Sequence, residues 1–551
     1  DGTYDYPRTA PTGAADPGQD PLDRTAPKAL AARADEVAVQ NGAAFLPLSA
    51  TTFPYACERI AAAFDHPGAG DLLLVHSPAG TDGHYTGNHG NLDVTQSRSP
   101  LILSGAGIRP ADGTPTGSYG ALARLVDVAP TAAKAIGIRT MQGKRLDGSA
   151  GTTYLARQDG RVLSEVLDGT TAQQGVIIVS DGMSHTRLRQ LIERGQLPNI
   201  AQLVARGGFF EYGAIGNFPS NTYPGHNVIG TGCYSGHHGL LDNDWVDRKQ
   251  RVVTDPYHEK IGTSDYIRSD VETLFDAATR TFGKWDGALG GAYTVSVFDP
   301  CARGAELQVL ELSAAGGFPV PEGECPVVAP AGLSPYLTAG VALNQFSTML
   351  VQRQFLEAGS KHPAPKVTIL NLPLTDMLGH ELGPHHAMAD PAYVVTDACI
   401  GYLMKTLQKM NLFQNTLFVL TADHGMAQQD PATPGTIGDA LRQAGVEAKF
   451  SSERFLYLEC LDVAAPAGLA KGKSQRVEVV VKDDDYDAFN VRPPVPETAV
   501  TIQIGSQRWA GRTDWTGKVT FDVAPPAGAS EATLVVDAPG YTRVERKIPI
   551  R

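Results

Sequence analysis

The chain has 551 residues, which is too long for one ordinary domain, and its 42% hydrophobic and 19% charged residues are typical of a folded globular protein. A net charge of −13 argues against binding to a nucleic-acid backbone, and no apolar run reaches the roughly 18 residues that a membrane span needs. We therefore expect a large domain with an accessory module, acting on a small molecule.

The front of the chain reads as an arm followed by alternating helices and strands. Residues 1–26 are rich in Pro, Gly and Asp, and we expect them to form an extended arm. A helix is predicted over Tyr55–Phe64, before an apolar strand over Asp71–Ser77. A second strand is predicted over Ser99–Gly105, and Val126–Ile138 has the Pro near its start and the Gly near its end that favour a helix.

A second α/β stretch begins with a predicted strand over Val176–Ser180. A predicted helix over Thr186–Arg206 follows, with a proline break inside it. Val367–Leu374 and Leu417–Thr421 are continuous apolar runs, which are typical of strands buried on both faces of a parallel sheet. The pattern predicts an α/β fold around a mostly parallel sheet.

The last part of the chain changes to short alternating strands without helices. These strands are predicted over Val477–Val481, Thr498–Ile504, Lys518–Val523 and Ala532–Ala538. We expect a small antiparallel β-sandwich of the immunoglobulin-like type over residues 475–551. It has no His or Cys and is a candidate for binding a surface or a protein partner.

The six cysteines form no CxxC pair, which argues against a zinc–thiolate site. Their even number fits disulfides in an exported protein, and Cys301 with Cys325 closes a short loop rich in Gly and Pro, so we predict a bridge there. The pairing of Cys57, Cys233, Cys399 and Cys460 stays open. We expect a secreted protein whose polar opening stretch is a mature end, although the composition also fits a cytosolic protein from a GC-rich genome.

The residues that carry chemistry surround one threonine. Thr222 lies on a tight turn, FPSNTYPGHN, and threonine is a poor nucleophile unless a metal or base activates it. Acidic and imidazole groups that can bind a metal follow the predicted strands; they are Asp181, Asp376, His380, Asp423 and His424. Ligand sites in open α/β sheets lie at the carboxyl ends of the strands. We therefore predict a metal-assisted nucleophile.

Five motifs in chain order carry a resemblance to a known family. They are DGMSHTRLRQLIERGQLPNIAQLVARGG, FPSNTYPGHN, TGCYSGHHGLLDN, TDMLGH and ADHGM. Together they resemble the nucleotide pyrophosphatase/phosphodiesterase branch of the alkaline phosphatase superfamily, over roughly residues 175–426. The resemblance implies an alkaline-phosphatase-like α/β fold and two Zn²⁺ ions, although other divalent metals fit the same ligands. One ion would be held by Asp181, Thr222, Asp423 and His424, and the other by Asp376, His380 and one more histidine.

That last histidine is missing from its usual place, since no histidine follows His424. The front segment NHGNLDVTQSRSPLILSGAGI, followed by VDVAPTAAKAIGI, resembles the family's C-terminal portion. We therefore expect a circular permutation of a catalytic domain over 27–470, in which 27–163 corresponds to the family's C-terminal part and 175–470 to its N-terminal part. His89 becomes the remaining ligand, with His84 as its competitor.

The resemblance also implies a function. Thr222 would attack phosphorus and form a phosphothreonine intermediate, and Asn243 would donate to a phosphate oxygen, which favours diesters such as nucleotides as substrates. His226 is expected to be structural rather than a ligand. Three alternatives stay open: a phosphomonoesterase, a phosphonate hydrolase of the phosphonoacetate type with the same site, and a non-catalytic binding protein that retains the fold.

Overall fold

The computed structural model describes residues 53–75, 85–247, 252–256, 263–309, 324–384, 386–430, 448–451, 454–458, 460–484 and 491–551. The predicted arm over 1–26 and the competing His84 lie outside these residues. The chain divides into two compact units. The larger comprises residues up to 67, 75–243 and 256–435, and the smaller comprises 68–74, 244–255 and 436–551.

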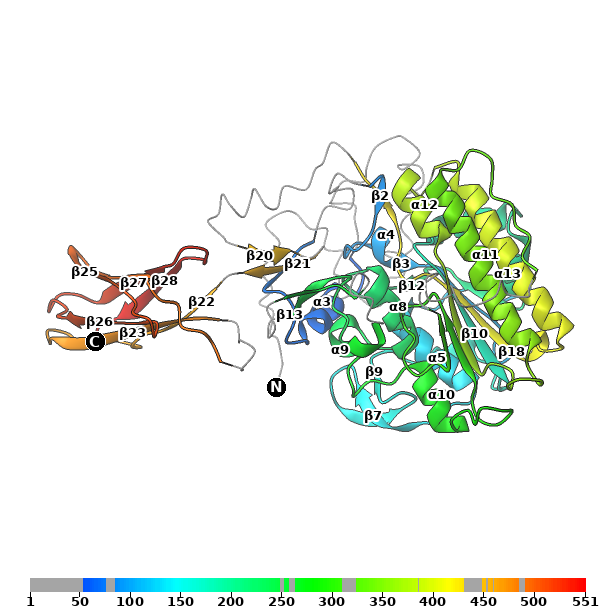
Figure 1. The fold of residues 1–551 in the computed structure, drawn as a ribbon, viewed down its shortest axis with the longest axis horizontal. Coiled ribbons are helices and arrows are strands. Elements are labelled where there is room, and N and C mark those ends of the chain that lie inside the picture. Colours follow the sequence, from blue (N-terminus) through cyan, green and yellow to red (C-terminus); the bar gives the residue numbers. More distant parts are fainter. Residues whose placement is uncertain are drawn as a thin grey trace. The chain divides into compact units, whose positions relative to one another are not determined.

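A large, mostly parallel sheet forms the centre of the larger unit (Figure 1). Its strands, in spatial order, are β16 (Leu307–Val309), β15 (Thr294–Val297), β17 (Val367–Leu372), β10 (Gln174–Ser180), β18 (Thr416–Thr421), β4 (Leu101–Gly105), β11 (Gly207–Phe210) and β5 (Ser118–Tyr119). Strand β10 pairs in parallel with both β17 and β18, and β4 pairs antiparallel with its two neighbours. The front segment of the chain thus supplies a strand inside the main sheet.

Helices cover both faces of this sheet (Figure 1). They include α5 (Val128–Ala135), α6 (His185–Glu193), α7 (Pro198–Ala205), α8 (Thr222–Thr231), α10 (Leu274–Phe282), α11 (Pro335–Leu356), α12 (Leu374–Leu382) and α13 (Ala389–Lys409). Three further helices of the unit are α3 (Ala56–Phe64), α4 (Val94–Ser97) and α9 (Ser235–His238). Strand β10 shows why both faces need cover: Ile178 packs in the core with α7, α11 and α13, whereas Ile177 packs in the core with α5, α8 and α10. Because both faces of β10 are buried, its sequence is continuously apolar, and this is the pattern from which the strand was predicted.

The structure has the predicted helices and strands, with local differences in their bounds. The single helix expected over 186–206 is two helices, because Pro198 begins α7 and cannot continue α6. The front strand expected over 71–77 shortens to β1 (Leu72–Leu73) within the described residues. The strand expected over 99–105 is interrupted at Pro100, which separates β3 (Arg98–Ser99) from β4.

The smaller unit has two antiparallel sheets that share one apolar core. One holds β22 (Leu461–Ala464), β23 (Gln475–Asp483) and β26 (Lys518–Val523), and the other holds β25 (Gln507–Arg512), β24 (Ala499–Ile504), β27 (Glu531–Asp537) and β28 (Val544–Pro549). In β24, Val500, Ile502 and Ile504 alternate into the core, as a half-buried strand requires. A third sheet joins β1, β21 (Phe455–Leu458) and β20 (Ala448–Ser451). The immunoglobulin-like assignment stays a prediction.

The predicted Cys301–Cys325 bridge is wrong, because the structure leaves both thiols free. The two cysteines pack in different places. The Cys301 sulfur lies against α8, where a Cβ on Gly230 would come within 2.3 Å of it. Cys325 belongs to the core around α11 and α13, and its Sγ is 3.5 Å from Sγ of Cys399. The spacing of the cysteines along the chain therefore did not predict which of them pack together.

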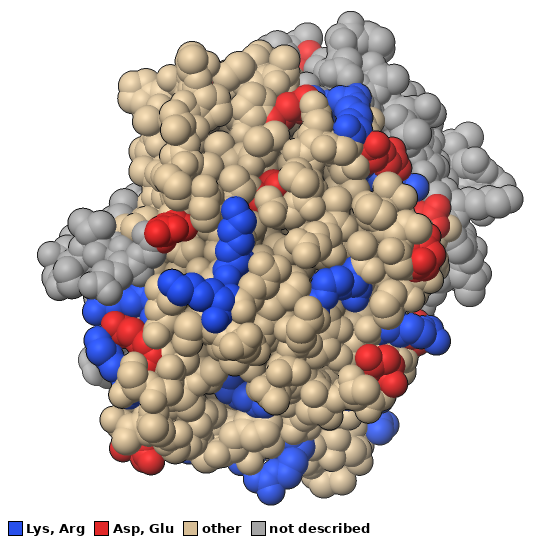
Figure 2. All heavy atoms as spheres, turned by 90° about the vertical axis from the view of Figure 1, so that its right-hand side faces the viewer, with Lys and Arg blue, Asp and Glu red and all other residues tan. Residues whose placement is uncertain are grey.

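Charged side chains are mixed on the face of the molecule shown in Figure 2. Among the described side chains visible there, Lys and Arg residues are interspersed with Asp and Glu residues and form no continuous basic surface. In the described parts of the chain, no helix combines the length and the apolar character that crossing a membrane requires.

Candidate metal centre

Three parallel strands of the main sheet end where the predicted acidic and imidazole groups begin. Asp181 follows β10 directly, and Asp423 with His424 lies just after β18. Past β17, the chain turns into α12, which carries Asp376 and His380 one helical turn apart. Neighbouring parallel strands end at the same edge, so these residues meet although more than two hundred positions separate the first from the last.

Thr222 occupies the first position of helix α8 and faces this group of residues. Its Oγ1 lies 3.4 Å from Nε2 of His424. Asn243 stands beside it, because its side-chain oxygen accepts a hydrogen bond from the Tyr223 backbone N–H at 3.1 Å. With that oxygen engaged, the amide nitrogen of Asn243 is the end of the side chain that remains as a donor.

The front segment brings His89 to the same place. Strand β2 (Gly87–Asn88) pairs with β19 (Ala427–Gln428), just beyond His424. The loop after His89 is fixed by Asp93, a fully buried residue that caps α4 by accepting from the N–H groups of Thr95 and Gln96. A histidine from the first quarter of the chain is thereby held against groups from the last third.

The candidate ligands form two adjoining clusters. Atoms of Asp181, Asp423 and His424 that can bind a metal all lie within 4.8 Å of one another, and so do those of His89, Asp376 and His380. The rings of His89 and His424 stack with centroids 3.5 Å apart, which brings the two clusters side by side. The structure thus brings together every residue that the sequence predicted for the site.

The three imidazoles are oriented as metal ligands would be. The Nδ1 atom of each faces an oxygen: that of His89 lies 3.2 Å from the Ser220 carbonyl, that of His380 lies 3.0 Å from the Gly87 carbonyl, and that of His424 lies 2.8 Å from the Gly425 carbonyl. A proton on Nδ1 satisfies these carbonyls and leaves the Nε2 lone pair directed inward. The Nε2 atoms of His89 and His380 approach to 3.1 Å, a contact that a shared cation explains better than a hydrogen bond.

The carboxylates fit a cation as well. Oδ1 of Asp181 and Oδ2 of Asp423 are buried and accept no hydrogen bond in the structure. Buried carboxylate oxygens without donors are costly unless a cation compensates them. Carboxylate and imidazole ligands together suit zinc, and the residues present therefore fit a pair of divalent cations.

Comparison with known proteins gives the family of the chain. A family model described as type I phosphodiesterase/nucleotide pyrophosphatase matches residues 176–521, more than half of the chain. The chain belongs to this family. The family is a branch of the alkaline phosphatase superfamily, which accords with the mixed α/β fold and its large, mostly parallel sheet.

The individual family members that match the chain have low sequence identity to it. An uncharacterized pyrophosphatase/phosphodiesterase of Schizosaccharomyces pombe is 26% identical over 267 residues, which are 47% of this chain and 46% of the relative. Human ectonucleotide pyrophosphatase/phosphodiesterase family member 5 is 24% identical over 211 residues, 38% of this chain and 37% of the relative. Each match therefore covers less than half of the relative.

Among solved structures, the murine family member 5, in an inactive form in complex with AMP, matches with a TM-score of 0.35 and 16% identity. The match covers 64% of this chain and 88% of that one.

Burial and charge shift the pKa of His424, in the candidate metal centre, in opposite directions. Burial lowers the pKa of His424, but the charges of Asp423, Asp181 and Asp376 outweigh it and raise the pKa to about 9. Burial also raises the pKa of Asp423, and the neighbouring Asp181 carboxylate raises it further. In the metal-free protein His424 therefore carries a proton that a metal has to displace.

Two further residues join the site that sequence reasoning did not assign to it. His226 of α8 lies between Asp181 and Asp423, with its Nε2 atom 3.6 Å from Oδ2 of each, and its Nδ1 atom is 2.7 Å from Oδ2 of Asp299. All these groups are buried. Asp299 follows strand β15 as Asp181 follows β10, so the same signal, an acidic residue just past a buried apolar strand, would have found it.

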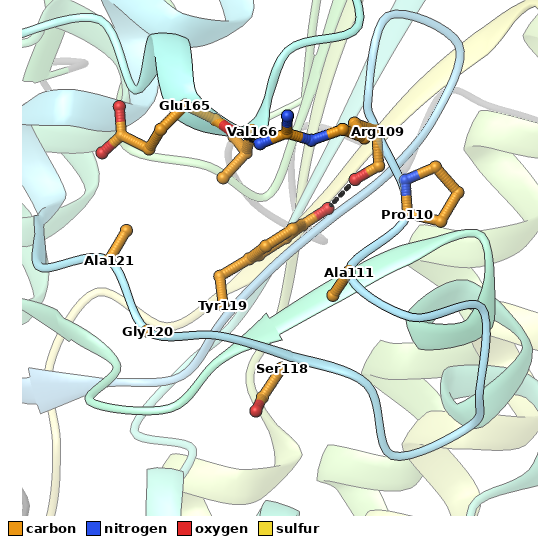
Figure 3. Close-up of a pocket in the computed structure, with 9 residues that line it drawn as sticks. All are labelled: Arg109, Pro110, Ala111, Ser118, Tyr119, Gly120, Ala121, Glu165 and Val166. Atoms are coloured by element: carbon orange, nitrogen blue, oxygen red, sulfur yellow. Dashed lines mark hydrogen bonds between the residues drawn. The ribbon is translucent and has the colours of Figure 1, made fainter.

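A separate cavity of about 370 Å³ holds none of these residues. It is lined by Arg109, Pro110, Ala111, Ser118, Tyr119, Gly120, Ala121, Glu165 and Val166 (Figure 3). The Tyr119 hydroxyl is already engaged, since it donates to the Arg109 carbonyl (Figure 3). The lining offers neither paired carboxylates nor an imidazole, so we assign no chemistry to this cavity.

Proposed function

We propose that the protein is a two-metal phosphodiester hydrolase of the nucleotide pyrophosphatase type, with Thr222 as its nucleophile. The observation that carries the proposal is the place of the Thr222 hydroxyl, 3.4 Å from His424 and next to two adjoining clusters of acidic and imidazole groups that could hold metal ions. Family membership supports the reaction class.

One zinc ion would be held by Asp181, Asp423, His424 and Thr222, and the second by His89, Asp376 and His380. When bound, two such cations lower the pKa of a hydroxyl or water and neutralise charge on the attacking and leaving oxygens of a phosphoryl transfer. We call these positions the Thr222-side site and the His89-side site.

The residues of the chain then act in two steps. Thr222 Oγ1 releases its proton to solvent and forms a bond to phosphorus, while the bond from phosphorus to the leaving oxygen breaks and that oxygen takes up a proton from solvent. Water next attacks the phosphothreonine, the Oγ1–P bond breaks, and a phosphomonoester and free Thr222 result. The Asn243 amide donates to a non-bridging oxygen, which stabilises the charge that develops in each transition state.

We also propose that the catalytic domain is a circular permutation of the family fold. The sequence relates strand β4 and the His89 loop to the family's C-terminal portion. Strand β4 pairs with β18, and β2, just before His89, pairs with β19, just after His424. This proposal also includes secretion of the protein and the domain limits expected from the sequence. It further includes an immunoglobulin-like type for the last 77 residues, with a surface or a protein as their partner.

A panel of esters tests the proposed activity. Zinc-loaded protein should hydrolyse bis-p-nitrophenyl phosphate and a nucleotide diester faster than p-nitrophenyl phosphate or phosphonoacetate, and Thr222→Ala should abolish turnover while the metal content stays unchanged. A faster monoester or phosphonoacetate reaction would favour those alternatives. No hydrolysis of any ester with metal bound would indicate a binding protein, and undiminished activity of Thr222→Ala would reject the nucleophile.

A further inference from the structure

A buried chain of polar groups runs away from the metal centre, and the proposed mechanism does not use it. It begins at Asp181 and Asp423, passes through His226 and ends at Asp299. His226 and Asp299 have no exposed side-chain surface. Burying a histidine among three carboxylates costs free energy, and the proposed mechanism gives no reason for that cost.

Each end of the His226 ring meets only acceptors. Its Nδ1 atom is 2.7 Å from Oδ2 of Asp299, and its Nε2 atom is 3.6 Å from Oδ2 of Asp181 and 3.6 Å from Oδ2 of Asp423. The contact with Asp299 is a hydrogen bond, which the Nδ1–H group donates to the carboxylate, whereas 3.6 Å is beyond hydrogen-bond distance. The Nε2 edge of the ring thus packs between the two ligand carboxylates.

Asp299 is itself held firmly. Its Oδ1 atom accepts a hydrogen bond from the Cys301 backbone N–H at 2.8 Å, which leaves Oδ2 for His226. The preceding residue, Phe298, has φ of 53°, an unusual backbone conformation for a bulky side chain. Its ring packs against Phe346, with centroids 6.1 Å apart. Such strain persists where the surrounding structure imposes it, often next to a functional site.

We propose that Asp299 and His226 are a positioning pair for the Thr222-side site: Asp299 fixes the ring by a hydrogen bond, and the ring, whose Nε2 atom lies 3.6 Å from Oδ2 of both Asp181 and Asp423, holds these two carboxylates in place before a metal arrives. Two buried carboxylates in one site repel each other, and a fixed ring packed against both limits how far either can move. The inference rests on the proposed two-metal function, and it assigns these residues a role through the ligands rather than on the substrate.

Zinc affinity of the metal-free protein tests the pair without relying on turnover. Zinc titration in competition with a chromophoric chelator gives a dissociation constant for each of the two sites. The variant His380→Ala lacks a ligand of the His89-side site, so the constant that remains in it belongs to the Thr222-side site. His226→Gln should weaken zinc binding at the Thr222-side site about 10- to 100-fold, as loss of a group that orients ligands does, and Asp299→Asn about 10-fold. The constant of the His89-side site should not change.

Two buried residues outside the proposed ligand set supply matched controls. Asp397 caps α7 by accepting from the Ile200 N–H at 2.7 Å, and His238 contacts the Pro224 carbonyl at 3.2 Å. Asp397→Asn and His238→Gln should leave both zinc constants unchanged, whatever they cost in stability. The absorption bands of Co²⁺ at the Thr222-side site should shift in His226→Gln and not in His238→Gln, since only the former alters the ligand carboxylates.

The outcomes separate this inference from the proposed function. Wild-type protein that binds two zinc ions, while both variants of the pair bind zinc as tightly as wild type or more tightly, would overturn the positioning role alone. Equal weakening in the controls would overturn it too, because general destabilisation would then explain the loss. Wild-type protein that binds no zinc would overturn the proposed function and the pair together. If His226→Gln does not fold, Asp299→Asn, which preserves volume, decides.

Discussion

Gly182 is the position where one added carbon tests the geometry of the metal centre most sharply. It follows Asp181, has φ of +60°, and a Cβ built on it would lie 2.8 Å from Oδ1 of Asp376 and 2.9 Å from the Asp376 Cα. Gly182→Ala therefore adds two costs. A left-handed conformation costs a residue with a side chain about 1 kcal/mol, and overpacking against Asp376 costs about 1–3 kcal/mol more.

Gly195 offers a matched control. Its φ is +71°, and a Cβ there would meet nothing within 4 Å, so Gly195→Ala carries the backbone cost alone. Urea unfolding of the metal-free proteins should show Gly182→Ala less stable than Gly195→Ala by about 1–3 kcal/mol. The added Cβ should also displace Asp376 and so weaken zinc binding at the His89-side site. Each 1.4 kcal/mol needed to return Asp376 to its ligand position lowers the zinc affinity about tenfold. Equal unfolding free energies and equal zinc affinities of the two variants would refute the close packing of Gly182 on Asp376.

Three further predictions concern the site itself. His89→Ala should lower zinc affinity at the His89-side site about 100-fold or more, because about 10–16 kcal/mol shared among three protein ligands gives about 3–5 kcal/mol each; elemental analysis should find one equivalent, whereas His84→Ala should retain two, and the reverse would replace His89 by His84. Asn243→Ala should reduce kcat on a diester about 100-fold with unchanged metal content, and an unchanged kcat would remove Asn243 from the mechanism. Because the pKa of His424 is raised to about 9, zinc must displace its proton below that pH, so affinity at the Thr222-side site should rise about tenfold per pH unit between about pH 6 and pH 8 and level off above 9; a flat profile would contradict a protonated His424.

The sequence was informative wherever local pattern and position along a strand determine the result. Apolar runs ending in Asp181 and Asp423 predicted both the buried strands and the edge where a site forms. Thr222 was recognisable by its motif, and His89 by the glycine and apolar run that follow it. The structure brings these residues together, although their roles as nucleophile and ligands await the experiments above.

The sequence was uninformative where contacts depend on packing between distant elements. Cys301 and Cys325 are close along the chain, yet one faces α8 and the other faces Cys399, so a loop length could not pair them. Strand β28 was not predicted, because its segment VERKIP carries charged residues on an exposed stretch. The partnership of His226 with Asp299 crosses 73 positions and leaves no periodic trace.

Anomalous diffraction at the zinc absorption edge from zinc-loaded crystals tests the central claim most directly. We predict two peaks about 4 Å apart, the spacing of paired catalytic metals. One peak should lie against Asp181, Asp423 and His424 beside the Thr222 hydroxyl, and the other against His89, Asp376 and His380. A single peak, or a second peak that lacks His89 among its ligands, would contradict the account.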